Sequence, residues 1–151
     1  MTEQPRDAAA FRIQNEKVIE EFSSRAGKVG GPLSGRDVLL LATTGAKSGL
    51  PRLSPLVHFT VDDKLLIVGS FEGNDVDPGW VHNLRANPRA HIEVGRAHID
   101  VGIESYDVTA RELPRPERDA AYPKIIDIEP GFGVFEAKTK RVIPLFELQR
   151  I

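Results

Sequence analysis

The strongest constraint on the fold is a run of three β-patterned segments that follow one another with only short turns between them. Val38–Thr43, Leu50–Thr60 and Lys64–Ser70 are rich in β-branched and aliphatic residues, and the connections Gly45–Gly49 and Asp62–Asp63 contain typical turn residues. Such short turns join antiparallel strands, because a parallel pair needs a crossover of about a dozen residues or more. The pattern therefore argues against an alternating parallel α/β fold, because no helices separate these three segments.

The rest of the chain adds further strands and a few short helices. About six strands with hairpin-length links predict a mainly β, α+β domain built as an antiparallel barrel. Pro55 indicates an edge or a bulge in the second strand, and Pro116 and Pro123 predict an interrupted helix. The further strands that we expect are Ala90–Val94, Ala97–Val108 and Arg141–Leu148, and the helices are Pro78–Asn87, Pro114–Ile126 and Gly131–Thr139.

The chain before the strands has a different pattern, typical of an amphipathic helix. The expected helix, Asp7–Ala26, has four apolar residues near one face, which are Phe11, Val18, Ile19 and Phe22. Glycines and a proline after this helix break the chain into a loop. We expect residues 1–35 to form an N-terminal helix and a Gly/Pro-rich linker, and residues 36–151 to form the barrel domain.

Composition and charge narrow the kinds of partner. A length of 151 residues suits one domain, and a formal net charge of −2 argues against nucleic acid, for which a basic face is expected. The absence of cysteine excludes disulfides and thiolate chemistry and fits a cytoplasmic protein. No apolar run approaches the ~20 residues of a transmembrane segment. Acids on the first expected helix disfavour peripheral contact with anionic lipid.

The segment Thr43–Arg52 concentrates groups that can bind an anion. Thr43 and Thr44 supply hydroxyls, the turn supplies backbone amides, and Lys47 and Arg52 add charge-assisted hydrogen bonds. It is not a P-loop, because the required glycine spacing and the following helix are absent. The same composition also fits a solvated hairpin with charged tips.

The segment Asp77–Pro88 holds the only tryptophan of the chain. Trp80 and Leu84 lie four residues apart on one helix face, so Trp80 can pack on the barrel or line a ligand site. His82 and Asn83 can approach a ligand or simply be solvated. We expect no metal site, since the spacing of the histidines matches no known ligand motif; they are His58, His82, His91 and His98.

Taken together, these segments resemble the deazaflavin-dependent nitroreductase and quinone reductase family of actinobacteria. The matching stretches are Leu39–Arg52, Ser54–Leu56, Pro78–Pro88 and Lys138–Pro144. The resemblance implies a split β-barrel that binds coenzyme F420. With the hydroxyls of Thr43 and Thr44, the residues expected to contact the cofactor are Ala46, Lys47, Ser48, Arg52, Leu53, Ser54, Pro55, Leu56, Val57, Val68, Gly69, Ser70, Phe71, Gly79, Trp80, Val81, His82 and Asn83.

The chain departs from the family pattern where the acceptor is expected to bind. Phe71 stands where relatives often have a lysine, so one cationic contact is missing. Relatives that reduce nitroimidazoles have tyrosines near the C-terminal helix, where this chain has Glu129, Phe132 and Phe135. These changes indicate a planar, quinone-like acceptor rather than a nitroimidazole.

The resemblance implies an oxidoreductase that transfers a hydride from reduced F420 to such a small-molecule acceptor. Ser70 and His82 are the candidate catalytic residues, the first for electrostatic help and the second as a proton source. We expect Trp80, Phe132 and Phe135 to line the substrate site. The alternatives are a non-catalytic split-barrel protein that binds F420, a fatty acid or another flat ligand, and an oxidoreductase that uses flavin mononucleotide (FMN). The chain is expected to be a monomer or a homodimer.

Overall fold

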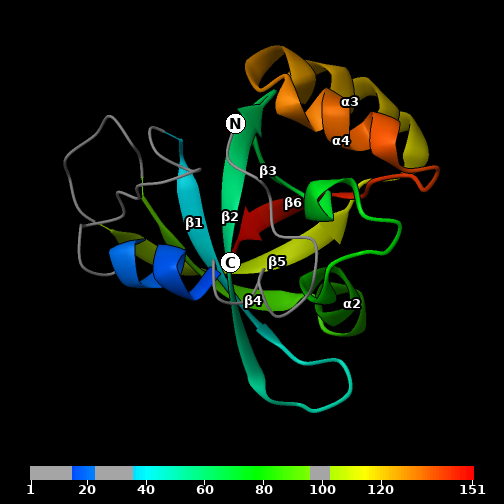
Figure 1. The fold of residues 1–151 in the computed structure, drawn as a ribbon. Coiled ribbons are helices and arrows are strands. Elements are labelled where there is room, and N and C mark those ends of the chain that lie inside the picture. The colour runs from blue at the N-terminus through cyan, green and yellow to red at the C-terminus, as the bar shows by residue number, and fades with distance from the viewer. Residues whose placement is uncertain (1–14, 23–35, 96–102) are drawn as a thin grey trace.

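The computed structural model describes residues 15–22, 36–95 and 103–151, which form a closed six-stranded antiparallel barrel (Figure 1). Around the barrel the strands follow the order β1-β2-β3-β6-β5-β4. The strands are β1 (Val38–Thr44), β2 (Pro51–Val61), β3 (Lys64–Val68), β4 (Arg89–Val94), β5 (Glu104–Glu112) and β6 (Leu145–Arg150). The expected antiparallel barrel is therefore confirmed.

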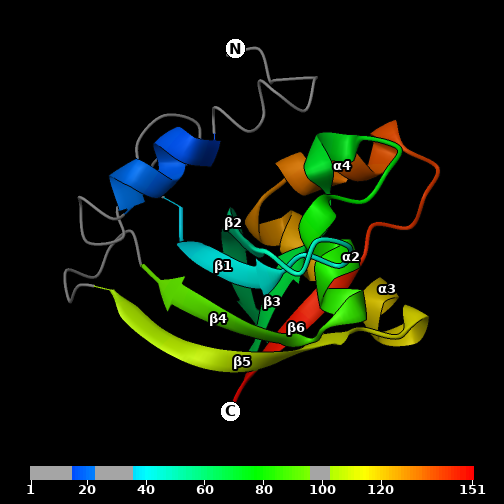
Figure 2. The same ribbon diagram turned by 90° about the horizontal axis from the view of Figure 1, so that it is seen from below.

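Four short helices and one short helical segment surround the barrel. They are η2 (Phe71–Gly73, a 3₁₀ helix), α2 (Gly79–Ala86), α3 (Arg115–Ile128), α4 (Gly131–Lys138) and the helical residues 15–22. The helices α3 and α4 pack together over one end of the barrel, whereas residues 15–22 lie beside β1 (Figures 1 and 2). Within the described residues, no helix is long and apolar enough to cross a membrane.

Only part of the expected N-terminal helix falls within the described residues. Residues 15–22 are helical, and Val18 and Phe22 are buried against Val38 and Leu40 of β1. Phe11 and the expected linker lie outside the described residues. The division of the chain at residue 35 therefore stays a prediction.

Two larger apolar clusters make up the rest of the core. One fills the barrel and includes Leu39, Ile67, Trp80 and Phe146. The other lies under α3 and α4 and is built around Tyr122, which donates a 2.8 Å hydrogen bond to the Phe132 carbonyl. The barrel thus has a filled interior and a separate helical cap at one end.

The strand β2 is much longer than its neighbour β3, and this difference opens the barrel wall. β2 has 11 residues and β3 has 5, and β3 pairs only with the stretch from His58 to Val61. Among the described residues, the first part of β2, including Pro55, pairs only with β1. The expected edge position of Pro55 is confirmed.

Three element boundaries differ from the sequence-based expectation. The strand β3 ends at Val68 rather than Ser70, and β6 begins at Leu145 rather than Arg141. The Gly69 amide still donates to the Pro144 carbonyl at 2.9 Å, but Pro144 has no N–H to donate in return, so the ladder between the two strands stops there. The helix α3 continues through Pro123, which is exposed, so the carbonyl that loses its amide partner can face water.

The strand β5 also differs from its expected range. It was expected at Ala97–Val108 and is observed at Glu104–Glu112, with residues 96–102 outside the described part. The strand extends to Glu112 because its last residues pair with β6, from Val108 opposite Arg150 to Glu112 opposite Phe146. That pairing is a long-range contact, which local residue patterns do not reveal.

Candidate functional site

A pocket of about 790 Å³ lies where β2 runs on past the end of β3. Its walls come from the free stretch of β2, the segment that follows β3, the start of α2 and the helical residues 15–22. The lining residues are Asn15, Glu16, Ile19, Arg52, Leu53, Ser54, Phe71, Pro78, Gly79, Trp80 and Asn83. Pockets of this size accommodate cofactors and other small molecules.

The β1–β2 turn beside the pocket is closed by its own backbone. The Gly45 amide donates to the Leu50 carbonyl at 2.8 Å, and the Gly49 amide donates to the Gly45 carbonyl at 2.9 Å. Gly49 has a φ of 69°, a left-handed conformation that glycine adopts without steric cost. The Ser48 hydroxyl accepts from the Leu50 amide at 3.1 Å, so this serine shapes the turn.

Asn83 ties this turn to α2. Its Oδ1 accepts a 2.9 Å hydrogen bond from the Ala46 amide, and its Nδ2 donates to the Thr43 hydroxyl at 3.1 Å. Asn83 and Thr43 are both buried, which makes these bonds costly to break. The turn and the helix thus keep a fixed position relative to each other on one side of the pocket.

Two cations stand at this side of the pocket without a carboxylate partner in the described part of the chain. Arg52 is exposed, and its one described hydrogen bond is a 3.5 Å contact from Nη1 to the Pro51 carbonyl. Lys47 is exposed on the turn and is not among the pocket-lining residues. Their charges are therefore available to an anionic ligand.

Trp80 and Phe71 give the pocket an aromatic surface, and the buried hydroxyl of Ser70 lies next to Phe71 in the chain. Trp80 is 6% exposed and packs edge-on against Phe146, with ring centroids 5.6 Å apart. Phe71 lines the pocket from a left-handed backbone conformation, with a φ of 44°. Ser70 is buried, and its hydroxyl makes no hydrogen bond to any residue that the structure describes. A buried hydroxyl of this kind needs a partner, which a ligand can supply.

The other residues expected at the site lie around the pocket rather than in its lining. Val81 is fully buried in the barrel core, and His82 is exposed on α2. Thr43 and Thr44 border a second hollow of about 370 Å³, which also includes His91 and Asp107. Expected contact residues outside the pocket lining are Thr43, Thr44, Ala46, Lys47, Ser48, Pro55, Leu56, Val57, Val68, Gly69, Ser70, Val81 and His82.

The structure does not bring the expected substrate-lining aromatics together. Trp80 lines the pocket, whereas Phe132 is buried in the cluster under α3 and α4. The Phe132 ring makes edge contacts with Phe59 and Phe135, at centroid distances of 5.3 and 5.5 Å. Glu129 forms a 3.1 Å ion pair with Arg36. Substrate contact by Phe132 and Phe135 stays a prediction.

Two groups at the site were missed by sequence reasoning. Asn15, Glu16 and Ile19 line the pocket from the N-terminal helical segment. The buried face of that segment, marked by Phe22, was the signal that it packs on the barrel. Arg141 holds the segment after β3. It lies in the stretch Lys138–Pro144, which resembles the family, but the sequence alone indicated no role for it.

No metal site is apparent in the described residues. No group of three or more metal-ligating side chains gathers there. The nearest candidate is His91, whose Nδ1 lies 2.8 Å from Asp107. This hydrogen bond holds the pKa of the Asp107 carboxyl below its usual value, which is typical of a surface ion pair.

The fold and pocket define a small barrel protein that can hold a flat, anionic ligand at a gap in its wall. Residues 12–149 match the family model described as F420H(2)-dependent quinone reductase, and the chain belongs to this family. A Mycobacterium tuberculosis protein of that name is 35% identical over 130 residues, covering 82% of this chain and 81% of its own.

Two solved structures are similar to this chain, and one of them carries a description that agrees with the family. A structure described as an F420-H2 dependent reductase is 34% identical, with a TM-score of 0.60, covering 74% of this chain and 93% of its own. A structure described as a domain-swapped dimer is 31% identical, with a TM-score of 0.62, covering 91% of this chain and 96% of its own. The expected family resemblance is confirmed.

Proposed function

We propose that this chain is an oxidoreductase that binds coenzyme F420 in the pocket beside β2 and reduces a quinone-like acceptor. The observation that carries the proposal is the make-up of the pocket. Seven of its eleven lining residues are among those that the family resemblance assigns to the cofactor; these are Arg52, Leu53, Ser54, Phe71, Gly79, Trp80 and Asn83.

The residues present fit the chemistry of this cofactor. F420 carries an anionic phosphodiester and polyglutamate tail, and Lys47 and Arg52 offer cationic groups without described acidic partners. Its flat ring suits a wall formed by Phe71 and Trp80. The buried Ser70 hydroxyl offers a hydrogen bond that no described residue uses.

The chain contributes binding, orientation and exclusion of water. When bound, the reduced deazaflavin supplies the hydride. The hydrogen bonds of Asn83 hold the turn and α2 in a fixed position relative to each other, so this side of the pocket is held in place for a ligand. Phe71, Trp80 and Ile19 form apolar surface that keeps water from the reacting atoms.

Two groups can support charge or proton movement. The Ser70 hydroxyl can donate to negative charge that develops on the acceptor. His82 is exposed on α2 and is the candidate proton source. Replacing Ser70 with alanine is expected to lower kcat more than it raises KM, and replacing His82 with glutamine is expected to lower kcat.

Ligand binding tests this function against its alternatives. Purified protein is titrated separately with oxidised F420, FMN and a long-chain fatty acid, and the reduced cofactor is then offered to a panel of quinones. We expect F420 to bind more tightly than FMN and its reduced form to be consumed with quinones. Tighter binding of FMN overturns the cofactor assignment. Binding of F420 without turnover on any quinone supports the non-catalytic alternative.

Assembly and location belong to the same proposal. We propose a small-molecule acceptor, a cytoplasmic location and a monomer or homodimer as the working state. The 31% identical relative described as a domain-swapped dimer supports the homodimer. Sedimentation equilibrium over a range of concentrations distinguishes the two assembly states.

A further inference from the structure

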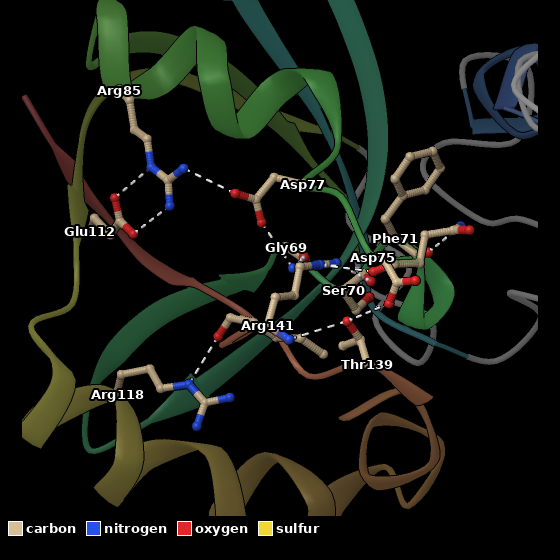
Figure 3. Close-up of polar contacts among 12 residues, drawn as sticks. Gly69, Ser70, Phe71, Asp75, Asp77, Arg85, Glu112, Arg118, Thr139 and Arg141 are labelled. Atoms are coloured by element: carbon tan, nitrogen blue, oxygen red, sulfur yellow. Dashed lines mark hydrogen bonds and ion pairs between the residues drawn. The ribbon is translucent and has the colours of Figure 1, made fainter. Parts of the chain in front are cut away.

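Arg141 is bonded four times to one short segment of the chain (Figure 3). Its Nε donates to the Asn74 carbonyl at 2.8 Å, and its Nη2 donates to the Ser70 carbonyl at 2.8 Å. Its Nη1 donates to the Gly69 carbonyl at 3.1 Å and to Asp77 Oδ1 at 2.8 Å. The side chain is only 14% exposed, so these bonds are sheltered from water.

The segment held by Arg141 has a backbone shape that L-residues adopt at a cost. Phe71, Glu72 and Gly73 have φ values of 44°, 54° and 81°. Such conformations at non-glycine residues persist only where the surroundings enforce them. The Asn74 side chain contributes a 2.7 Å bond to the Phe71 carbonyl, and Arg141 fixes the carbonyls on either side.

The same guanidinium is coupled through Asp77 to α2, the helix that carries Trp80. Asp77 accepts from Arg141 through Oδ1 and from Arg85 through Oδ2, the latter at 3.0 Å. Arg85 lies on α2 and also forms a two-pronged pair with Glu112, with both distances 2.8 Å. The segment that carries Phe71 and the helix that carries Trp80 are therefore tied to one charged network (Figure 3).

We propose that Arg141 is a positioning residue for the cofactor pocket, because it holds Phe71 and the start of α2 at the spacing that a flat ring requires. This inference rests on the proposed function, since it assigns the ring to that pocket. In Figure 3 the Phe71 ring points away from the guanidinium, so Arg141 acts through the backbone that it holds. Arg141 itself is not among the pocket-lining residues.

Arginine and lysine are not interchangeable at this position. The planar guanidinium carries five donors pointing in fixed directions, and four of them are used here. An ammonium group donates from a single atom and cannot span carbonyls on opposite sides of a loop. Arg141→Lys therefore keeps the charge beside Asp77 while it releases part of the segment.

The test compares Arg141→Lys with a matched variant, Arg118→Lys. Arg118 is also buried and also donates to a carbonyl, that of Ile143 at 2.9 Å, but it holds the helical cap instead of the pocket. We expect both variants to melt at a lower temperature. Only Arg141→Lys is expected to weaken binding of oxidised F420, by about tenfold. It is also expected to shift the emission of Trp80, the only tryptophan, to longer wavelength.

The inference is overturned if folded Arg141→Lys keeps the F420 affinity and the Trp80 emission of the unchanged protein. It is also overturned if Arg118→Lys loses as much F420 affinity as Arg141→Lys does. If Arg141→Lys does not fold, Asp77→Asn replaces it, because it removes the charged link between Arg141 and Arg85 and changes few atoms. If the unchanged protein binds no F420, the proposed function fails. Trp80 emission of the variants without ligand then decides whether Arg141 positions the wall.

Discussion

No carboxylate among the described residues neutralises the charges of Arg52 and Lys47. A hydrogen bond to a charged partner contributes roughly 1.5–3 kcal/mol, and ~1.4 kcal/mol is a tenfold change in affinity. We expect Arg52→Ala to weaken F420 binding by about 10- to 150-fold. Lys47→Ala is expected to cost less, because an ammonium group is more strongly hydrated than a guanidinium.

Isothermal titration at two salt concentrations measures both effects, and a melting curve checks folding. Both losses are expected to shrink at high salt, where binding of the unchanged protein is itself screened. A solvated hairpin would instead leave the affinity of both variants unaltered. Normal affinity in a folded Arg52→Ala protein would mean that the anionic tail binds elsewhere on the barrel.

Glu72 makes the stability of the protein depend on pH. Burial raises the pKa of its carboxyl above the usual value of 4.5, and the charge of Lys138 partly opposes this effect. As pH rises from 4.5 through the folded-state pKa, the unfolded chain loses its proton first, so the folded state becomes less stable. Glu72→Gln is expected to lack this decrease.

Urea unfolding of both proteins across pH 4 to 8 tests the role of Glu72. As the pH rises, the unfolding free energy of Glu72→Gln is expected to increase relative to that of the unchanged protein. This change is expected to level off above the folded-state pKa of Glu72. A difference that does not vary with pH would show that the carboxyl titrates equally in both states.

At the scale of elements, the helical residues 15–22 depend on one buried ring. Phe22 has no exposed surface and packs with Val18 against Val38 and Leu40. Truncating a buried phenylalanine costs about 3–5 kcal/mol. Phe22→Ala is expected to destabilise the protein by about that amount and to weaken F420 binding, because Ile19 on the same segment lines the pocket.

Lys17→Ala is the matched control, since Lys17 is exposed on the same segment. Its free energy of unfolding is expected to stay within about 0.5 kcal/mol of the unchanged protein. Denaturant unfolding gives both stabilities, and Trp80 fluorescence gives both affinities. If Phe22→Ala is destabilised but binds F420 normally, the segment supports the barrel without shaping the pocket.

Elements set by local chemistry could be predicted from sequence, and those set by distant contacts could not. The β1–β2 hairpin was foreseen because Gly45 and Gly49 punctuate two apolar runs. The end of β3 was not, because it depends on the strand's partner: the ladder stops at Pro144, which lies 75 residues beyond Gly69 and has no N–H to donate. Seven of the eleven residues that line the pocket are among those that the family resemblance assigns to the cofactor, whereas Ile19 reaches the pocket only through tertiary packing.

At the scale of the whole molecule, the distribution of tyrosines bears on the acceptor. The chain has two, Tyr106 and Tyr122, and neither lines the pocket. The Tyr122 hydroxyl is bonded to the Phe132 carbonyl, and burial raises its pKa to about 12. A nitro-bearing ring would therefore find no phenolic proton donor among the lining residues.

Quinones are accordingly expected to be better acceptors than bicyclic nitroimidazoles. An apolar, aromatic wall can stack on a quinone ring without donating a proton to it. Steady-state kcat/KM with reduced F420, measured for a quinone and a nitroimidazole under the same conditions, decides the order. Efficient nitroimidazole turnover would point to a proton source other than a pocket tyrosine.

The open stretch of β2 also bears on how the folded chain avoids aggregation. An unpaired strand edge is a template for another chain, and natural proteins often blunt such edges. The His58 amide donates to the Asp37 carbonyl, toward β1, and donor directions alternate along a strand. Positions 51 and 55 therefore face the side on which the described residues supply no strand partner. Both positions are prolines, which have no N–H. The open edge of β2 beside the pocket therefore lacks some of the backbone N–H groups that an incoming strand would need for pairing.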